Sequence, residues 1–254
     1  MAEITGYAPG TPSWIDLITP DMEAAKAFYG GLFGWERTTP DPKMGGYAFF
    51  LRNGKQACGV APITSPEQHP SWTTYIATAD ADATAQAVRD NGGHVVMEPM
   101  DVMDTGRMAL FTDPTGAFFG VWQPGTHTGA QVANEAGAFC WNELLTRDMD
   151  AAKAFYPQVF SWGIEASGEG ATAYTQWQVN GRSIAGGMAM PDAIPAEIPA
   201  LWRVYFGVAN CDATVAKAQA AGGALLIPAV DSPNGRFAVL ADPFGASFAV
   251  IQVQ

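Results

Sequence analysis

An internal repeat limits the folds that are open to this chain. Residues 13–29 read SWIDLITPDMEAAKAFY, and residues 140–156 read CWNELLTRDMDAAKAFY. The tryptophan, an acid, the threonine and the run Ala-Ala-Lys-Ala-Phe-Tyr recur at one constant offset, which indicates a duplication. We therefore expect two related halves that are built on the same plan.

Each copy of the repeat predicts a short strand followed by an amphipathic helix. Apolar residues recur at helical spacing after the turn. We expect the helix to begin after a threonine cap, Thr19 or Thr146, with acids in its first turn. A second strand–helix unit follows in each half, with its strand at residues 72–77 or 202–207.

The later part of each half predicts more strands and tight turns. Asn-Gly at 53–54 and at 180–181 is a strong hairpin signal. An Asp-Pro-x-Gly turn joins the last two strands of each half. Two strand–helix–strands units in each half predict an α+β fold, with halves at residues 1–125 and 137–254 and a linker at 126–136.

Composition argues against two classes of partner. The formal net charge is −12 and basic residues do not cluster, whereas binding to nucleic acids or to anionic membranes needs basic patches on the protein.

Cys58, Cys140 and Cys211 lack paired spacing, so we expect no disulfide framework and a cytoplasmic location. We also expect no signal peptide and no membrane span, because neither pattern is present. The chain is expected to be a monomer or a homodimer.

Side-chain alternation along the strands predicts which residues face a concave surface. Because successive side chains point to opposite faces, Ile15 and Leu17 are expected under the helix, and Trp14 and Asp16 on the concave face. Each half then has a surface of aromatic rings with one carboxylate, the composition of a small-molecule pocket. The other concave residues are expected to be Thr73, Tyr75, Gly120 and Trp122, with Trp141, Glu143, Arg203, Tyr205 and Ile251 in the second half.

Three motifs carry a family resemblance. They are Phe-Tyr followed by Phe-Gly-Trp at 33–35, a helix that ends in Asn-Gly-Gly at 91–93, and Asp-Pro-Thr-Gly at 113–116 before the last strand. With them each half resembles the vicinal oxygen chelate superfamily, which includes glyoxalase I, extradiol dioxygenases, and fosfomycin and bleomycin resistance proteins. The resemblance implies two tandem glyoxalase-like domains, each of paired βαβββ modules that form a U-shaped curved sheet around a cavity.

The resemblance also implies where metal ligands would stand. Enzymes of the superfamily usually place His or Glu at four positions, and this sequence has other residues there: Trp14 and Trp141, Thr73 and Arg203, Gly120 and Ala249, and Gly59 and Gly186. A divalent metal needs several converging His or carboxylate side chains. We therefore expect no metal and no cofactor. The three histidines, His69, His94 and His127, are expected to be solvated surface residues.

Asp16 and Glu143 are the candidate catalytic residues. A carboxylate beside an indole on a concave face is partly desolvated, which raises its pKa towards the range of a general acid or base. Alternatively, each acid only holds the pocket together through hydrogen bonds. The candidate ligand-binding residues are Trp14, Tyr75, Arg107, Trp122, Trp141, Arg203, Tyr205 and Arg236.

The arginines leave several roles open. Arg107 and Arg236 recur in equivalent Gly-Arg strands and could bind an anionic ligand, pair with Asp16 or Glu143, or anchor a strand end. Arg203 occurs in the second half only, so it could distinguish the two pockets.

Three functional hypotheses follow. The first is a protein that binds a small apolar or aromatic metabolite, with or without acid/base chemistry from its carboxylates. The second is a metal-dependent enzyme, either a glyoxalase-type lyase or an oxidoreductase such as a dioxygenase or hydroxylase; the missing ligands argue against it. The third is that one half serves only as an assembly surface.

Overall fold

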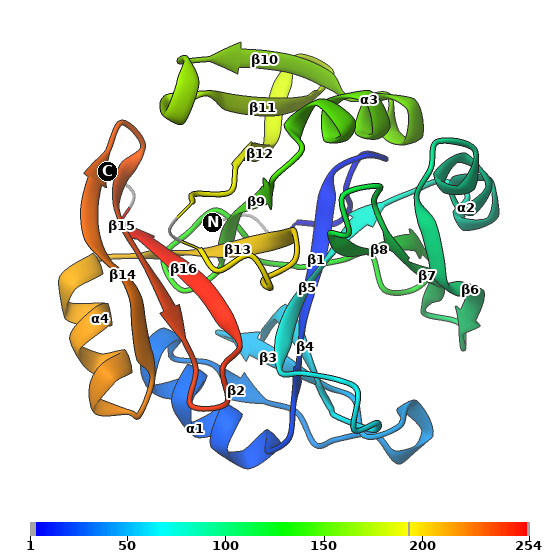
Figure 1. The fold of residues 1–254 in the computed structure, drawn as a ribbon. Helices are drawn as coiled ribbons and strands as arrows, with labels where there is room; N and C mark the ends of the chain where they lie inside the picture. Colours follow the sequence, from blue (N-terminus) through cyan, green and yellow to red (C-terminus); the bar gives the residue numbers. More distant parts are fainter. Residues whose placement is uncertain (1–3, 193, 253–254) are drawn as a thin grey trace.

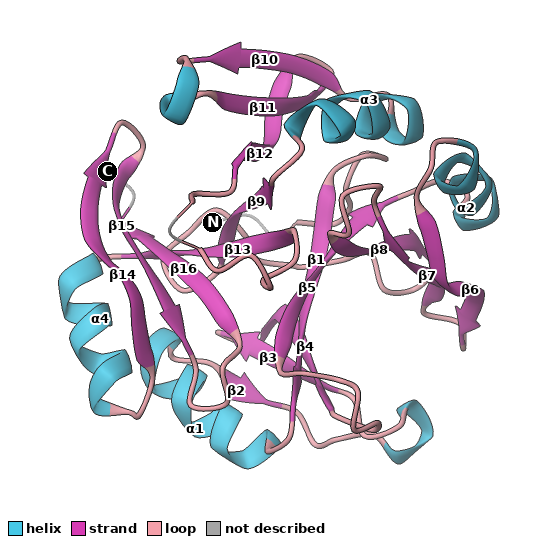
Figure 2. Cartoon of the chain, in the orientation of Figure 1, coloured by secondary structure: helices cyan, strands magenta, loops and turns pink. Residues whose placement is uncertain are grey.

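The computed structural model describes residues 4–192 and 194–252 as a tandem α+β protein in which strands predominate (Figure 2). The first half contains β1 (Pro12–Thr19), α1 (Met22–Phe33), β2 (Glu36–Arg37), a 3-10 turn (Pro42–Met44), β3 (Ala48–Arg52), β4 (Lys55–Pro62), β5 (Ser71–Ala77), α2 (Ala81–Asp90), β6 (His94–Val102), β7 (Gly106–Thr112) and β8 (Phe118–Pro124). The second half contains β9 (Phe139–Thr146), α3 (Met149–Phe160), β10 (Gly163–Ser167), a 3-10 turn (Gly170–Thr172), β11 (Tyr174–Val179), β12 (Arg182–Ala189), β13 (Leu201–Val208), α4 (Cys211–Ala220), β14 (Ala224–Ser232), β15 (Gly235–Ala241) and β16 (Ser247–Gln252).

The two strand–helix units of each half join through their first strands. β1 pairs in parallel with β4 and antiparallel with β5, while β9 pairs in the same way with β12 and β13. The strand order is β2-β3-β4-β1-β5-β8-β7-β6 in the first half and β10-β11-β12-β9-β13-β16-β15-β14 in the second. A bridge between Leu201 of β13 and Phe118 of β8 joins the two sets of strands into one 16-stranded sheet. The predicted α+β fold of two tandem glyoxalase-like domains with a curved sheet is confirmed.

The local signals in the sequence account for the turns and, with one correction, for the helix starts. Asn53 and Gly54 have φ of 51° and 77°, as a hairpin of the predicted type requires. The predicted threonine caps are wrong. Asp21 and Asp148 cap α1 and α3, because their carboxylates accept hydrogen bonds from backbone N–H groups of the first turn.

The helices pair across the two halves rather than within them. Figure 1 shows α1 beside α4 and α2 beside α3, and residues of these helix pairs are in contact. Phe33 of α1 lies with its ring centroid 4.9 Å from that of Phe206 in the second half. In the other core, Tyr156 of α3 donates a hydrogen bond of 2.8 Å to Asp113 of the first half. The two largest hydrophobic cores are therefore each shared by both halves, whereas a smaller cluster around Tyr205 lies within the second half.

None of the helices in residues 4–192 and 194–252 is long and apolar enough to cross a membrane. A cytoplasmic location and a monomeric or homodimeric state stay predictions.

Candidate functional site

Strand alternation brings four residues of the first half together on the concave face. Asp16 Oδ2 accepts hydrogen bonds from the hydroxyls of Tyr75 at 3.1 Å and Tyr47 at 3.3 Å. Trp14 Nε1 donates to the hydroxyl of Tyr47 at 2.9 Å. We call Trp14, Asp16, Tyr47 and Tyr75 the first cluster. It links an indole to a buried carboxylate through a phenol.

The second half repeats this arrangement with Trp141, Glu143, Tyr174 and Tyr205, the second cluster. Glu143 accepts a hydrogen bond of 2.9 Å from Tyr174 and one of 2.7 Å from Tyr205, each on a different oxygen. Trp141 Nε1 donates to the hydroxyl of Tyr174 at 3.0 Å. Tyr47 and Tyr174 were not among the predicted site residues. Both follow the cluster tryptophan by 33 positions, so the repeat itself carried the signal.

Tyrosine side chains fill the space beside the carboxylates. A Cβ atom built on Gly59 would lie 1.7 Å from the Tyr47 hydroxyl oxygen, and one on Gly186 would lie 1.9 Å from that of Tyr174. A Cβ on Gly120 would lie 2.4 Å from the ring of Tyr75. Within the described residues, no group of three or more His, Cys, Asp or Glu side chains could hold a metal ion. The glycines thus leave room for the tyrosines of the clusters.

Burial controls the charge state of the first cluster. It raises the pKa of Asp16 to about 6, although hydrogen bonds from Tyr75, Tyr47 and Thr73 act in the opposite direction. Burial and the nearby Asp16 charge also raise the pKa of Tyr47 and of Tyr75 well above the ordinary value. Both phenols therefore stay protonated and act as donors, and Asp16 changes its charge near pH 6.

The chain between the halves covers the first cluster. The imidazole of His127 lies 4.5 Å from the indole of Trp14 between ring centroids, and its Nδ1 is 3.0 Å from Gln56 Oε1. Trp122 Nε1 donates to the carbonyl oxygen of His127 at 2.8 Å. The prediction that His127 is a solvated surface residue is wrong. It is half-buried, and burial lowers its pKa to about 4.

His69 and His94 are exposed, as predicted. Asn134 and Glu135 belong to the same linker as His127, and Glu135 accepts a hydrogen bond from Arg52 of the first half. The linker is therefore bound along the first half through several polar contacts. Distant contacts of this kind leave no periodic signal in the sequence.

The second cluster is more open and has a cation beside it. The difference lies at the indole: Trp14 is only 3% exposed, whereas its counterpart Trp141 is half-buried. The tyrosines Tyr47 and Tyr174 are both half-buried. Arg203 is 8% exposed and pairs with Glu143 across β13 and β9, so both side chains start from the same face of the sheet. Its Nε atom has no hydrogen-bond partner in the part of the chain that the structure describes.

Arg107 and Arg236 do not pair with the cluster carboxylates. Arg107 forms a bidentate contact with Asp82 in the first turn of α2, at 2.8 and 2.9 Å. Arg236 contacts Asp212 of α4 at the same two distances. These contacts anchor β7 and β15 to their helices, which was the alternative role. A role of Arg107 and Arg236 in ligand binding stays a prediction.

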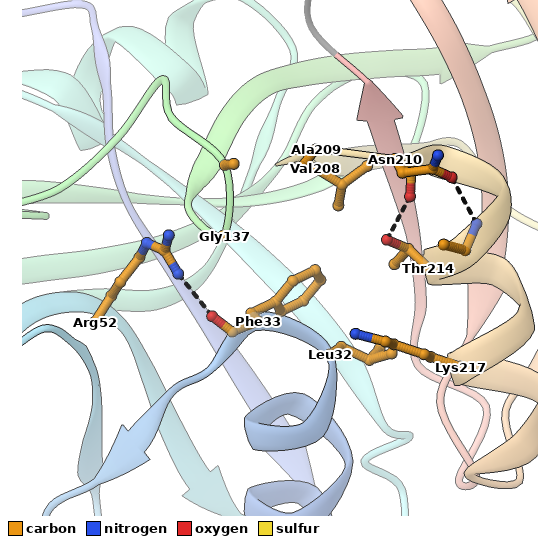
Figure 3. Close-up of a pocket in the computed structure, with 11 residues that line it drawn as sticks. Leu32, Phe33, Arg52, Gly137, Val208, Ala209, Asn210, Thr214 and Lys217 are labelled. Carbon is orange, nitrogen blue, oxygen red and sulfur yellow. Dashed lines mark hydrogen bonds between the residues drawn. The ribbon is translucent and has the colours of Figure 1, made fainter.

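A separate cavity of about 230 Å³ lies where the two halves meet (Figure 3). Its wall is formed by the end of α1, the start of α4 and the linker, with Arg52 and Lys217 as its cationic residues. Arg52 donates a hydrogen bond of 2.7 Å to the Phe33 carbonyl oxygen. We call this the seam cavity. It contains neither cluster carboxylate.

Comparison with protein families identifies both halves. A model described as the Glyoxalase/Bleomycin resistance protein/Dioxygenase superfamily matches residues 11–121, and one described as a Glyoxalase-like domain matches residues 139–251. Both matches lie inside the predicted halves, whose limits stay a prediction.

Two curated relatives match along nearly their whole length. CFP32 of Mycobacterium bovis, provisionally named a glyoxylase, is 44% identical over 260 residues, covering 99% of this chain and 98% of its own. The anthracycline biosynthesis protein DnrV of Streptomyces peucetius is 39% identical over 266 residues, covering 99% of this chain and 96% of its own.

Solved structures share the fold at low identity. The Mn(II)-bound glyoxalase from Novosphingobium aromaticivorans matches with a TM-score of 0.66 and 17% identity, over 96% of this chain and 82% of the other. The 2,2',3-trihydroxybiphenyl 1,2-dioxygenase from Sphingomonas wittichii matches with a TM-score of 0.66 and 13% identity, over 97% of this chain and 92% of the other. At such identities the likeness concerns the fold alone.

Proposed function

Because this chain belongs to the glyoxalase/bleomycin resistance protein/dioxygenase superfamily, we propose that it binds a small aromatic metabolite on the concave face of its second half. The observation that carries the proposal is the second cluster. It combines a half-buried indole and phenol with a buried carboxylate, and the buried guanidinium of Arg203 lies beside it. Such a mixture of apolar surface and a few fixed polar groups is typical of small-molecule sites.

The second half is the better candidate because its cluster is less covered. In the first half, the His127 ring packs on Trp14, and the backbone N–H of Ala130 donates to the Ser13 carbonyl oxygen at 2.9 Å. A ligand there would have to displace the linker. We infer that the first half has mainly a structural role, in line with the hypothesis that one half serves only as an assembly surface.

We further propose that ligand binding does not require a metal. The metal positions implied by the resemblance hold tryptophan, threonine, arginine, alanine and glycine. At Gly59 and Gly186 a longer side chain would collide with a cluster tyrosine. The donor set of this chain therefore does not fit a divalent ion. This argues against the alternative of a metal-dependent lyase or dioxygenase.

The name of one relative supports an aromatic ligand. DnrV is named for the biosynthesis of anthracyclines, which are polycyclic aromatic compounds. Aromatic rings stack on or pack edge-to-face against indole and phenol rings, and such pairs add about 0.5–1.5 kcal/mol beyond the effect of buried area. Trp141 offers such a ring on the second concave face.

Glu143 is the group that we propose for any proton transfer to or from the ligand. Both of its oxygens accept a tyrosine hydrogen bond, which leaves further acceptor capacity on each. Its first role is to orient the ligand by accepting hydrogen bonds from donor groups of the ligand. If neither Glu143→Gln nor Asp16→Asn changes ligand binding or turnover, the carboxylates have only a structural role.

The proposal is tested by calorimetric titration with methyl 2-naphthoate, a neutral aromatic probe, in the presence of excess EDTA. We expect binding to the unmodified protein and an affinity several-fold lower for Trp141→Phe, because the larger indole is lost. Trp14→Phe is the matched control and should bind as the unmodified protein does. Loss of binding in EDTA, or a loss caused by Trp14→Phe rather than Trp141→Phe, would contradict the proposal.

A further inference from the structure

Arg203 is a buried cation for which the described part of the chain provides no hydrogen-bond or ion-pair partner. Its side chain is 8% exposed, and it forms no hydrogen bond or ion pair with residues 4–192 or 194–252, its Nε atom included. A buried charge is costly unless it is paired and hydrogen-bonded. The five N–H donors of a guanidinium match the two oxygens of a carboxylate particularly well.

The nearby carboxylate does not fill this role. Glu143 lies opposite Arg203 on the neighbouring strand, but its oxygens accept hydrogen bonds from Tyr174 and Tyr205 instead. The Arg203 charge does act on the Tyr205 hydroxyl, whose pKa it lowers against the larger effect of burial. The guanidinium thus lies beside the second cluster, and its Nε–H donor has no partner among the described residues.

The first half provides the comparison. Thr73 stands opposite Asp16 across β5 and β1, as Arg203 stands opposite Glu143. Thr73 is neutral, and its hydroxyl lowers the pKa of Asp16 against the larger effect of burial. The covered cluster therefore has no cation, and the open cluster has one. This difference is the one expected if only the open cluster receives an anion.

We propose that the ligand of the second half carries a carboxylate on its aromatic ring system, and that Arg203 binds this carboxylate. The inference rests on the proposed function, since it places the aromatic part of the ligand against Trp141. The ligand carboxylate accepts hydrogen bonds from the free guanidinium N–H groups, while Glu143 stays bound to its two tyrosines.

The test compares 2-naphthoate with its neutral methyl ester by calorimetric titration at pH 8. We expect the unmodified protein to bind 2-naphthoate at least about tenfold more tightly than the ester, the effect of one or two charged hydrogen bonds. Arg203→Thr, which installs the residue of the first half, should remove this preference, so that acid and ester bind with similar affinity. Arg203→Lys should restore part of it.

Lys217→Gln is the matched control, because the seam cavity also contains cations. It should not alter the preference. Equal binding of acid and ester, or a preference lost with Lys217→Gln and kept with Arg203→Thr, overturns the inference while the proposed aromatic site stands. If neither probe binds the unmodified protein, the inference and the proposed function both fail.

Discussion

Replacing Phe206 with alanine is expected to lower the free energy of unfolding of the whole chain by about 3–5 kcal/mol. Phe206 is fully buried in the second half. Its ring centroid lies 4.9 Å from that of Phe33 and 5.2 Å from that of Trp72, both in the first half. Because this core is shared, the loss should destabilise both halves together. Urea unfolding followed by fluorescence and far-UV circular dichroism measures the effect.

The control is Leu226→Ala, since Leu226 is 52% exposed in β14 and an exposed substitution should change the free energy of unfolding by about 0.5 kcal/mol or less. We expect one transition, coincident by both probes, for every variant. Two separate transitions in Phe206→Ala, with the first half unfolding as in the unmodified protein, would show that the halves have independent cores.

Asp16→Asn is expected to raise the free energy of unfolding at pH 8, by on the order of 2–3 kcal/mol. The pKa of Asp16 is about 6 in the folded chain against an ordinary value of 3.8, and each pKa unit corresponds to about 1.4 kcal/mol. The folded chain therefore binds this proton more tightly than the unfolded chain does. The stabilisation that the protonated Asp16 provides is complete below pH 3.8 and is lost as the pH rises through 6. Asparagine keeps an acceptor for Tyr75 and Tyr47.

The measurement is the difference in unfolding free energy between variant and unmodified protein at several pH values. His127 acts in the opposite direction: its pKa is about 4 in the folded chain, so it makes the free energy of unfolding fall on acidification. Both proteins contain His127, so its contribution cancels in the difference between variant and unmodified protein. The comparison variant is Glu143→Gln, which should give no gain, because it leaves the buried Arg203 without a nearby negative charge. A difference for Asp16→Asn that is negative, or independent of pH between 4 and 7, would contradict this account.

Local pattern predicted the parts of the site that lie on one strand. Strand alternation placed Trp14 and Asp16 on one face, and the structure joins them through Tyr47. Tyr47 itself was missed because it begins a different strand pair, although its counterpart Tyr174 occupies the equivalent place in the repeat. Constant spacing between repeated tyrosines and the cluster tryptophans would have identified both.

Contacts between distant segments could not be predicted. Periodicity shows that Phe28 and Tyr29 form an apolar helix face, but not that this face packs against the other half, where Tyr29 donates a hydrogen bond of 3.1 Å to Asp242. His127 was misplaced for the same reason. A polar, glycine-containing linker has no period, and its position depends on the shape of the sheet that it covers.

The metal content of the exhaustively dialysed protein tests the central claim most directly. Tyrosine hydroxyls occupy the space that a side chain would need at Gly59 and Gly186, and we propose that this leaves too few donors for a metal site of the family type. Elemental analysis should find no zinc, iron, manganese or nickel near a one-to-one ratio with protein. A stoichiometric metal that survives dialysis would contradict the proposal that this chain binds its ligand without a metal.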